Sequence, residues 1–176
     1  NLDNSDSTST TFSFANDKAK NFIYFSLTDK QKVDREPDAT KWDLLFTQYV
    51  SSSEPYGSTQ ALNQTVGGIL HNVGVEVAQA NNVNQDDYED YASETFSSHI
   101  NTIGFDWKDL DYAAMPPAWI IEDSVVYFVK SVDKDIWKVV LTGFDGSTSG
   151  SFIFNKTLLY EYVEPNDNVN DINGNI

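Results

Sequence analysis

The chain has 176 residues, of which 40% are hydrophobic and 14% aromatic, and its 11 Lys and Arg against 27 Asp and Glu give a formal net charge of −16. This composition can bury the core of one domain, and the charge opposes binding to nucleic-acid phosphates or to anionic lipid through a basic patch. The chain has no cysteine, which excludes disulfides, thiolate nucleophiles and cysteine-based zinc or iron–sulfur sites, and it has no apolar run near the roughly 20 residues that span a bilayer.

Both ends of the chain are polar. Residues 1–10 consist of Asn, Asp, Ser and Thr with a single Leu, and residues 164–176 are dominated by Asn and Asp. Such segments bury too little apolar area to offset chain entropy. We therefore expect a flexible N-terminal tether (1–10), one globular body (11–163) and a polar C-terminal tail (164–176). A chain that begins at Asn1 rather than Met is typical of one whose targeting segment has been removed.

The C-terminal tail also has a calcium-binding interpretation. Its alternating Asp and Asn residues, followed by Gly174, are partly similar to the ligand ladder of a calcium loop. Val169 falls where the first ligand carboxylate should be, so a solvated linker is favoured over a calcium site.

Strand signals recur along the body. Apolar or alternating runs occupy 21–27, 42–50 and 66–80, and the clearest ones occupy 124–131 and 136–144. The tetrapeptide Val-Asp-Lys-Asp joins the last two as a hairpin turn would. A further strand at 151–160 follows a Gly- and Ser-rich turn, so residues 124–160 are predicted to form an antiparallel meander.

One acidic segment interrupts the strand pattern. Residues 84–96 carry Tyr88 and Tyr91 on one helical face and Asn84 at a capping position, so the segment could be a short helix or an ordered loop. The predicted class is all-β, a single antiparallel domain with one or two short helices.

Catalytic patterns are absent from the sequence. Neither His71 nor His99 lies in a nucleophile motif, no G-x-S-x-G occurs, and Gly67-Gly68 is not followed by a phosphate-binding pattern. A glycan-processing enzyme would rest only on abundant carboxylates. We predict no catalytic residues and no resident metal site, and hence a protein that is not an enzyme.

Short motifs follow one another in a characteristic order between about residue 21 and residue 160. They are Y-F-S (24–26), W-D-L-x-F-x-x-Y (42–49), G-G-I (67–69), Trp107 before the Pro116-Pro117 turn, V-x-F-V-K (126–130), K-V-x-L-T-G-F (138–144) and G-x-x-x-F (150–154). This order resembles the HmuY family of secreted, lipid-anchored haem-binding proteins of Gram-negative bacteria. The resemblance implies an all-β fold, a location on the outer membrane or outside the cell, and a lipid anchor that is missing from this chain. It also implies capture of haem as cargo and its transfer to an outer-membrane haem receptor.

The resemblance also indicates where haem ligands should lie. Family members use His or Met side chains on two loops, the second between the Trp and the V-x-F-V-K strand, where this chain has Met115. The segment before Trp107 offers His99 as the first ligand, although the interval between the two is shorter than in the family. The predicted haem-binding residues are completed by aromatic side chains suited to a flat apolar ligand, namely Tyr112, Trp107 and Trp119.

Two alternatives stay open at this level. The ordinary role of a lone Met near prolines is to fill a gap in packing, and that of a lone loop His is simply to be solvated. If Met115 and His99 play those roles, the domain is a surface adhesion or interaction module that does not bind haem. Haem propionates would also need local help on a strongly acidic protein, from Lys108, Lys130 or backbone donors.

Overall fold

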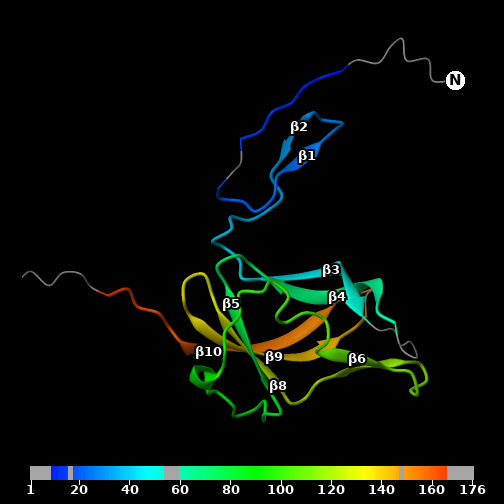
Figure 1. Ribbon diagram of the computed structural model, residues 1–176, viewed down its shortest axis with the longest axis vertical. Helices are drawn as coiled ribbons and strands as arrows, with labels where there is room; N and C mark the ends of the chain where they lie inside the picture. Colours follow the sequence, from blue (N-terminus) through cyan, green and yellow to red (C-terminus); the bar gives the residue numbers. More distant parts are fainter. Residues whose placement is uncertain (1–8, 16–17, 54–59, 147–148, 166–176) are drawn as a thin grey trace, which may run out of the picture. The chain divides into compact units, whose positions relative to one another are not determined.

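The computed structural model describes residues 9–15, 18–53, 60–146 and 149–165 (Figure 1). Contacts divide the chain into two units, residues 1–41 and 42–176, a boundary inside the segment that the sequence suggested as one body. Of the predicted tether only residues 9–10 are described, and of the predicted tail only residues 164–165. The calcium interpretation of the tail falls outside the described residues.

The first unit is built around a short hairpin. β1 (Tyr24–Ser26) pairs antiparallel with β2 (Gln31–Val33), and the Phe25 ring on β1 lies 5.0 Å from each of the rings of Phe12 and Phe14. The turn is fixed locally because the Ser26 hydroxyl donates to Asp29 at 2.8 Å.

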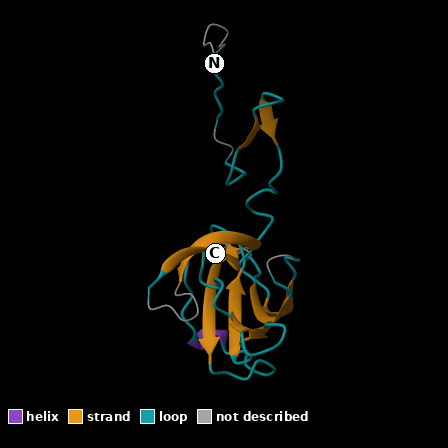
Figure 2. Ribbon diagram, turned by 90° about the vertical axis from the view of Figure 1, so that its right-hand side faces the viewer, coloured by secondary structure: helices purple, strands orange, loops and turns teal. Residues whose placement is uncertain are grey.

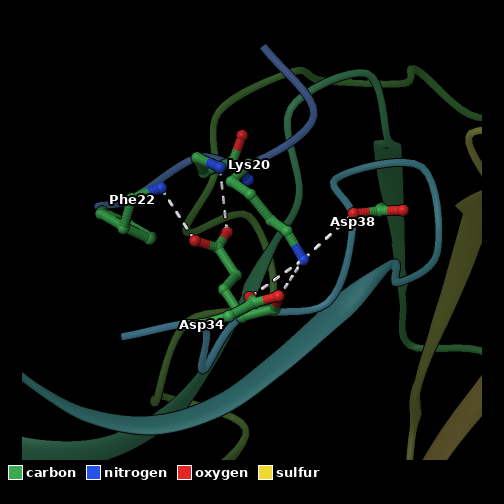
Figure 3. Close-up of polar contacts among 6 residues, drawn as sticks. Lys20, Phe22, Asp34 and Asp38 are labelled. Atoms are coloured by element: carbon green, nitrogen blue, oxygen red, sulfur yellow. Dashed lines mark hydrogen bonds and ion pairs between the residues drawn. The ribbon is translucent and has the colours of Figure 1, made fainter. Parts of the chain in front are cut away.

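Polar contacts tie the hairpin to its flanking segments. Figure 3 shows the Lys20 ammonium group directed at two carboxylates, Asp34 at 3.3 Å and Asp38 at 3.0 Å. The hydrogen bond to Asp38 is the largest of several causes that raise the pKa of Lys20. The Glu36 carboxylate accepts from the backbone N–H groups of Asn21 and Phe22, at 3.1 and 2.8 Å.

The second unit is almost entirely strands and loops (Figure 2). Its described elements, in chain order, are β3 (Leu44–Ser53), β4 (Leu62–His71), β5 (Glu76–Asn81), a turn of 3-10 helix (Tyr91–Ser93), β6 (Lys108–Asp111), β7 (Ala118–Ile121), β8 (Val125–Lys130), β9 (Ile136–Phe144) and β10 (Phe152–Tyr160).

The strands of the second unit pair antiparallel. One sheet has the order β10-β9-β8-β5, β3 pairs with β4 over their whole length, and β6 pairs with β7. In the centre of the large sheet, Tyr127 on β8 lies opposite Gln79 on β5 and Val139 on β9. The predicted meander of 124–160 is therefore confirmed as β8, β9 and β10, and so is the all-β class.

The large sheet is covered on both faces, which explains the unbroken apolar run of β8. The main core lies on one face and combines sheet residues with side chains from β4 and from the segment before β6; its buried members are Ile69, Val75, Val77, Ile103, Trp107, Tyr127, Val129, Val139, Leu141 and Phe144.

The acidic segment 84–96 covers the other face. It is an ordered loop with one turn of 3-10 helix rather than a longer helix, and the Asn84 side chain accepts from the backbone N–H of Asp86 at 3.0 Å. The rings of Tyr88 and Tyr91 lie 5.9 and 6.3 Å from the ring of Phe128 on β8. The Tyr88 hydroxyl donates to Glu94 at 2.6 Å, which is the main reason why its pKa rises to about 12.

Residues 97–104 connect the large sheet to the β3–β4 hairpin. At one end Ser97 and Val77 on β5 exchange two backbone hydrogen bonds of 2.9 Å, and at the other Gly104 and Ile69 on β4 exchange two of 2.8 and 3.1 Å. The hydrogen-bonded series therefore runs β3, β4, 97–104, β5, β8, β9, β10. Its two ends in the described part of the chain are β3 and β10.

The short strands β2, β6 and β7 were not predicted from the sequence. Among the described residues no helix is long and apolar enough to cross a membrane.

Candidate functional site

The β6–β7 hairpin carries most of the residues predicted to bind a ligand. Leu110 on β6 lies opposite Trp119 on β7, and Asp111 lies opposite Ala118. The Asp111 carboxylate accepts from the backbone N–H groups of Ala113 and Ala114, at 2.8 and 3.3 Å, and so shapes the start of the connection. This turn chemistry places residues 112–117 at the tip of the hairpin.

Met115 lies on this connection with 95% of its surface exposed. A methionine that fills a gap in a core makes contacts on every side, so this side chain does not have that role. Its thioether is accessible from solvent and is available to a ligand.

Other apolar side chains of the hairpin are exposed as well. Tyr112 next to the tip is 52% exposed, and Trp119 and Ile120 on β7 are also exposed. The Trp119 ring is held in place by the core, because it packs edge-on against the Phe144 ring with 5.0 Å between centroids. Successive residues of a strand point to opposite faces, so Trp119 and Ile120 lie on different faces of β7. The hairpin thus exposes apolar side chains on both faces and one thioether at its tip.

Trp107 has a different environment from the other predicted aromatic residues. It is only 2% exposed and packs in the main core, 6.0 Å from Phe144 and 6.1 Å from Phe152 between ring centroids. Its indole N–H is buried without a hydrogen-bond partner among the described residues. Trp107 supports the hairpin through Phe144, on which Trp119 also packs, and is not itself at the surface.

His99 is exposed on the segment that connects the sheets, and its backbone is held firmly. Its carbonyl oxygen lies 2.6 Å from Nε2 of the buried His71 and accepts from the hydroxyl of Thr102, also at 2.6 Å. In the described structure no hydrogen bond or ring contact joins the side chains of His99 and Met115. His71 is buried at the end of β4, as expected for a strand histidine.

Lys108 is a buried cation among aromatic rings. Its Nζ lies 4.3, 4.7 and 5.8 Å from the ring centroids of Trp107, Phe144 and Trp119, and donates to the carbonyl oxygens of Gly67 at 2.5 Å and Phe105 at 3.1 Å. Burial lowers the pKa of Lys108 to about 8. Since these partners occupy the ammonium group, Lys108 is not available to an anionic ligand, contrary to the sequence-based expectation. Lys130 is paired with Glu76 at 2.8 Å.

A second candidate region is a groove of about 300 Å³, lined by β3, β8, β9, β10 and the turn between β8 and β9. Its apolar lining includes Phe46, Trp137 and Phe154, and three carboxylates border it, namely Asp43, Asp133 and Asp135. Trp137 and Phe144 are seven positions apart on β9, which corresponds to about 23 Å in an extended strand. The groove and the β6–β7 hairpin are therefore separate sites.

No family model, curated protein or solved structure matches this chain. No pattern in the sequence indicates the groove, because its residues come from strands far apart in the chain. The only available signal was the group of carboxylates in the β8–β9 turn, and turns are commonly acidic. Among the described residues no cluster of three or more His, Asp or Glu could hold a metal ion.

Proposed function

We propose that this protein is a non-catalytic binding protein that captures haem, or a related tetrapyrrole, as cargo. The observation that carries the proposal is the 95% exposure of Met115 at the tip of a hairpin whose neighbouring side chains are also apolar and exposed. A soft thioether is a known axial ligand of haem iron, and exposed aromatic side chains suit the faces and edges of a macrocycle.

In this proposal His99 is the first axial ligand and Met115 the second. Both lie on loops, and the His99 backbone is anchored through His71. Uptake and release would then depend on movement of the hairpin tip, which buries little surface of its own. Trp119 and Tyr112 would contact the macrocycle, whereas Trp107 would act only by supporting Trp119 through Phe144.

The charge of the protein restricts how haem can sit. Lys108 is occupied by carbonyl groups and Lys130 by Glu76, so neither supplies a free ammonium group to a propionate. With a net charge of −16, the propionates should point toward solvent rather than toward the protein surface. A location on the outer membrane and transfer to a receptor are part of the proposal through the family resemblance alone.

The test is an absorbance titration of the purified protein with oxidised and with reduced haem. We expect a saturable one-to-one change of the Soret band and sharp low-spin bands on reduction. Met115→Leu keeps the shape and apolarity of the side chain but removes the sulfur, so it should change the spectrum and weaken binding at least tenfold. Leu158→Ala removes another exposed apolar side chain, from β10, and should leave the titration unchanged. A wild-type protein without a saturable change would refute the proposal, and an unaltered Met115→Leu titration would refute the ligand assignment.

A second candidate function is a surface interaction module that binds no haem. The groove between β3 and β10 favours it, because it supplies a concave apolar surface with charged borders away from the hairpin.

A further inference from the structure

The two ends of the hydrogen-bonded series, β3 and β10, face each other across the groove. The ring of Phe46 on β3 stacks on that of Phe154 on β10, with 5.3 Å between centroids and 21° between planes. Beside this contact the strands are separated by the groove, whose floor is formed by Val129, Trp137 and Val139 of the large sheet. Among the described residues β10 pairs only with β9, so its outer edge carries unpaired backbone groups.

The outer strand is poorly protected for an edge. β10 is nine residues long and carries one charged residue, Lys156. Natural edge strands are usually short, charged or covered, because a long open edge is a template for another strand. On β10, the large side chains of Ile153, Phe154, Leu158 and Tyr160 are exposed. Such an edge beside an apolar groove is the surface on which an extended peptide can add a strand and insert alternate side chains.

The charge at the groove identifies the kind of peptide. Hydrogen bonds hold two of the bordering carboxylates in place, because Asp43 accepts from the backbone N–H of Val132 at 3.2 Å and Asp135 from that of Tyr162 at 2.9 Å. Asp133 is exposed and lies on the turn between β8 and β9. Among the described residues that line the groove, the one cation is Lys156, whose Nζ lies 4.3 Å from the centroid of the Trp137 ring. The groove therefore holds an ammonium group of this chain, that of Lys156, over the Trp137 ring, and three carboxylates border it.

We propose that the outer edge of β10 and the adjoining groove bind an extended basic peptide segment of a partner protein. The peptide backbone pairs with β10, its alternate apolar side chains enter the groove beside Phe46 and Phe154, and its Lys or Arg side chains meet Asp43, Asp133 and Asp135. A second copy of this chain is a poor occupant, because each copy carries a net charge of −16 and the two would repel each other.

The probe is a synthetic peptide, acetyl-Lys-Lys-Thr-Val-Thr-Val-Thr-Lys-Lys-amide, titrated into the full chain by isothermal calorimetry. One comparison peptide has Glu in place of every Lys, and another is N-methylated at its five central residues, so that it keeps the charge but cannot pair with a strand. We expect saturable one-to-one binding of the first peptide, at least tenfold tighter than of either comparison peptide, and weaker binding as salt is added.

Matched protein variants distinguish binding in the groove from general attraction of a basic peptide to an acidic protein. Asp43→Asn, Asp133→Asn and Asp135→Asn together keep acceptor oxygens and should weaken binding about tenfold. The control combines Asp87→Asn, Glu89→Gln and Asp123→Asn, which changes the net charge equally at exposed positions outside the groove. Asp133→Asn alone, for which the structure gives no hydrogen bond, should weaken binding by about threefold even if the triple variant folds poorly.

Several results would overturn the proposal. Equal binding of the N-methylated peptide would exclude strand pairing, and equal binding of the Glu peptide would exclude charge recognition. A control variant that loses as much affinity as the groove variant would reduce the effect to net charge. A dimer in sedimentation velocity that the basic peptide does not dissociate would assign the edge to a second copy. None of these readouts involves haem, so they are independent of the proposed haem binding.

Discussion

The ammonium group of Lys108 lies 4.3 Å from the centroid of the Trp107 ring, the residue that precedes it in the chain. Lys108 begins β6 and is 9% exposed, with carbonyl oxygens rather than a carboxylate as its hydrogen-bond acceptors. A buried ammonium group without a paired carboxylate is costly, even with cation–π contacts. Burial therefore opposes the charged form of Lys108, the residue that anchors the candidate haem hairpin to the core.

This burial predicts a specific dependence of stability on pH. Burial lowers the pKa of Lys108 from 10.5 to about 8, with Asp106 acting in the opposite direction. Between these two values the unfolded chain binds the proton and the native chain does not, so the contribution of Lys108 to the free energy of unfolding rises with pH, by about 1.4 kcal/mol per unit. Below about pH 8 both states are protonated and this contribution is flat.

Urea unfolding of the wild type and of Lys108→Met at intervals from pH 7 to pH 9.5 measures the effect. The free energy of unfolding of the wild type minus that of the variant should rise with pH above about pH 8. The hydrogen bonds lost in the variant add only a constant offset to this difference. The range ends below pH 10 because Tyr127, whose pKa is raised by burial, acts with the opposite sign once unfolded tyrosines ionise. Parallel curves would contradict the prediction.

Gly68 should tolerate no side chain. A Cβ at this position would lie 2.6 Å from the carbonyl oxygen of Gly104 and 2.9 Å from a ring carbon of Tyr49, so backbone would have to move. Gly68→Ala should therefore cost about 3 kcal/mol in the free energy of unfolding. Its neighbour Gly67 is the control, because a Cβ there meets side-chain ring atoms, Phe144 at 3.2 Å and Phe152 at 3.9 Å, and no backbone, so the cost should stay below about 1 kcal/mol. Equal losses in chemical denaturation would show that the approach of β4 to residue 104 is not the cause.

Substitution of the two histidines should change the stability of the protein to very different extents. Nδ1 of His71 lies 3.1 Å from the carbonyl oxygen of Asn72, and Nε2 lies 2.6 Å from that of His99. His71→Leu removes the buried imidazole that contacts both carbonyl oxygens and should cost about 2 kcal/mol. His99→Ala removes an exposed side chain and should change stability by less than about 0.5 kcal/mol. A stability loss for His99→Ala equal to that for His71→Leu, measured by thermal unfolding, would contradict the anchoring role of His71.

The sequence alone predicted the strands whose signals lie in neighbouring residues. β8, β9 and β10 combine apolar or β-branched runs with short turns, so their bounds differ from prediction by at most one residue at either end. β6 was missed because Lys-Asp-Leu-Asp has no apolar run. β7 (Ala118–Ile121) is apolar but only four residues long, and its pairing with β6 depends on the turn at Asp111.

The candidate site was predictable only in part, for a similar physical reason. The sequence could suggest Met115 as a ligand but could not tell an exposed thioether from a buried one. The burial of Lys108 and the groove at Trp137 both depend on contacts between segments far apart in the chain, as with Lys108 and Gly67, and no local pattern encodes them.

Tyr88 allows the contribution of a ring to be separated from that of a hydroxyl. Its ring covers Phe128 on the second face of the large sheet, while its hydroxyl bonds to Glu94 at the protein surface. Tyr88→Phe keeps the ring and should cost less than about 1 kcal/mol, whereas Tyr88→Ala uncovers Phe128 and should cost about 2 kcal/mol. The free energies of unfolding of both variants in urea decide the point. If Tyr88→Phe were as damaging as Tyr88→Ala, the loop would be held by the bond to Glu94, and the apolar cover over β8 would contribute little.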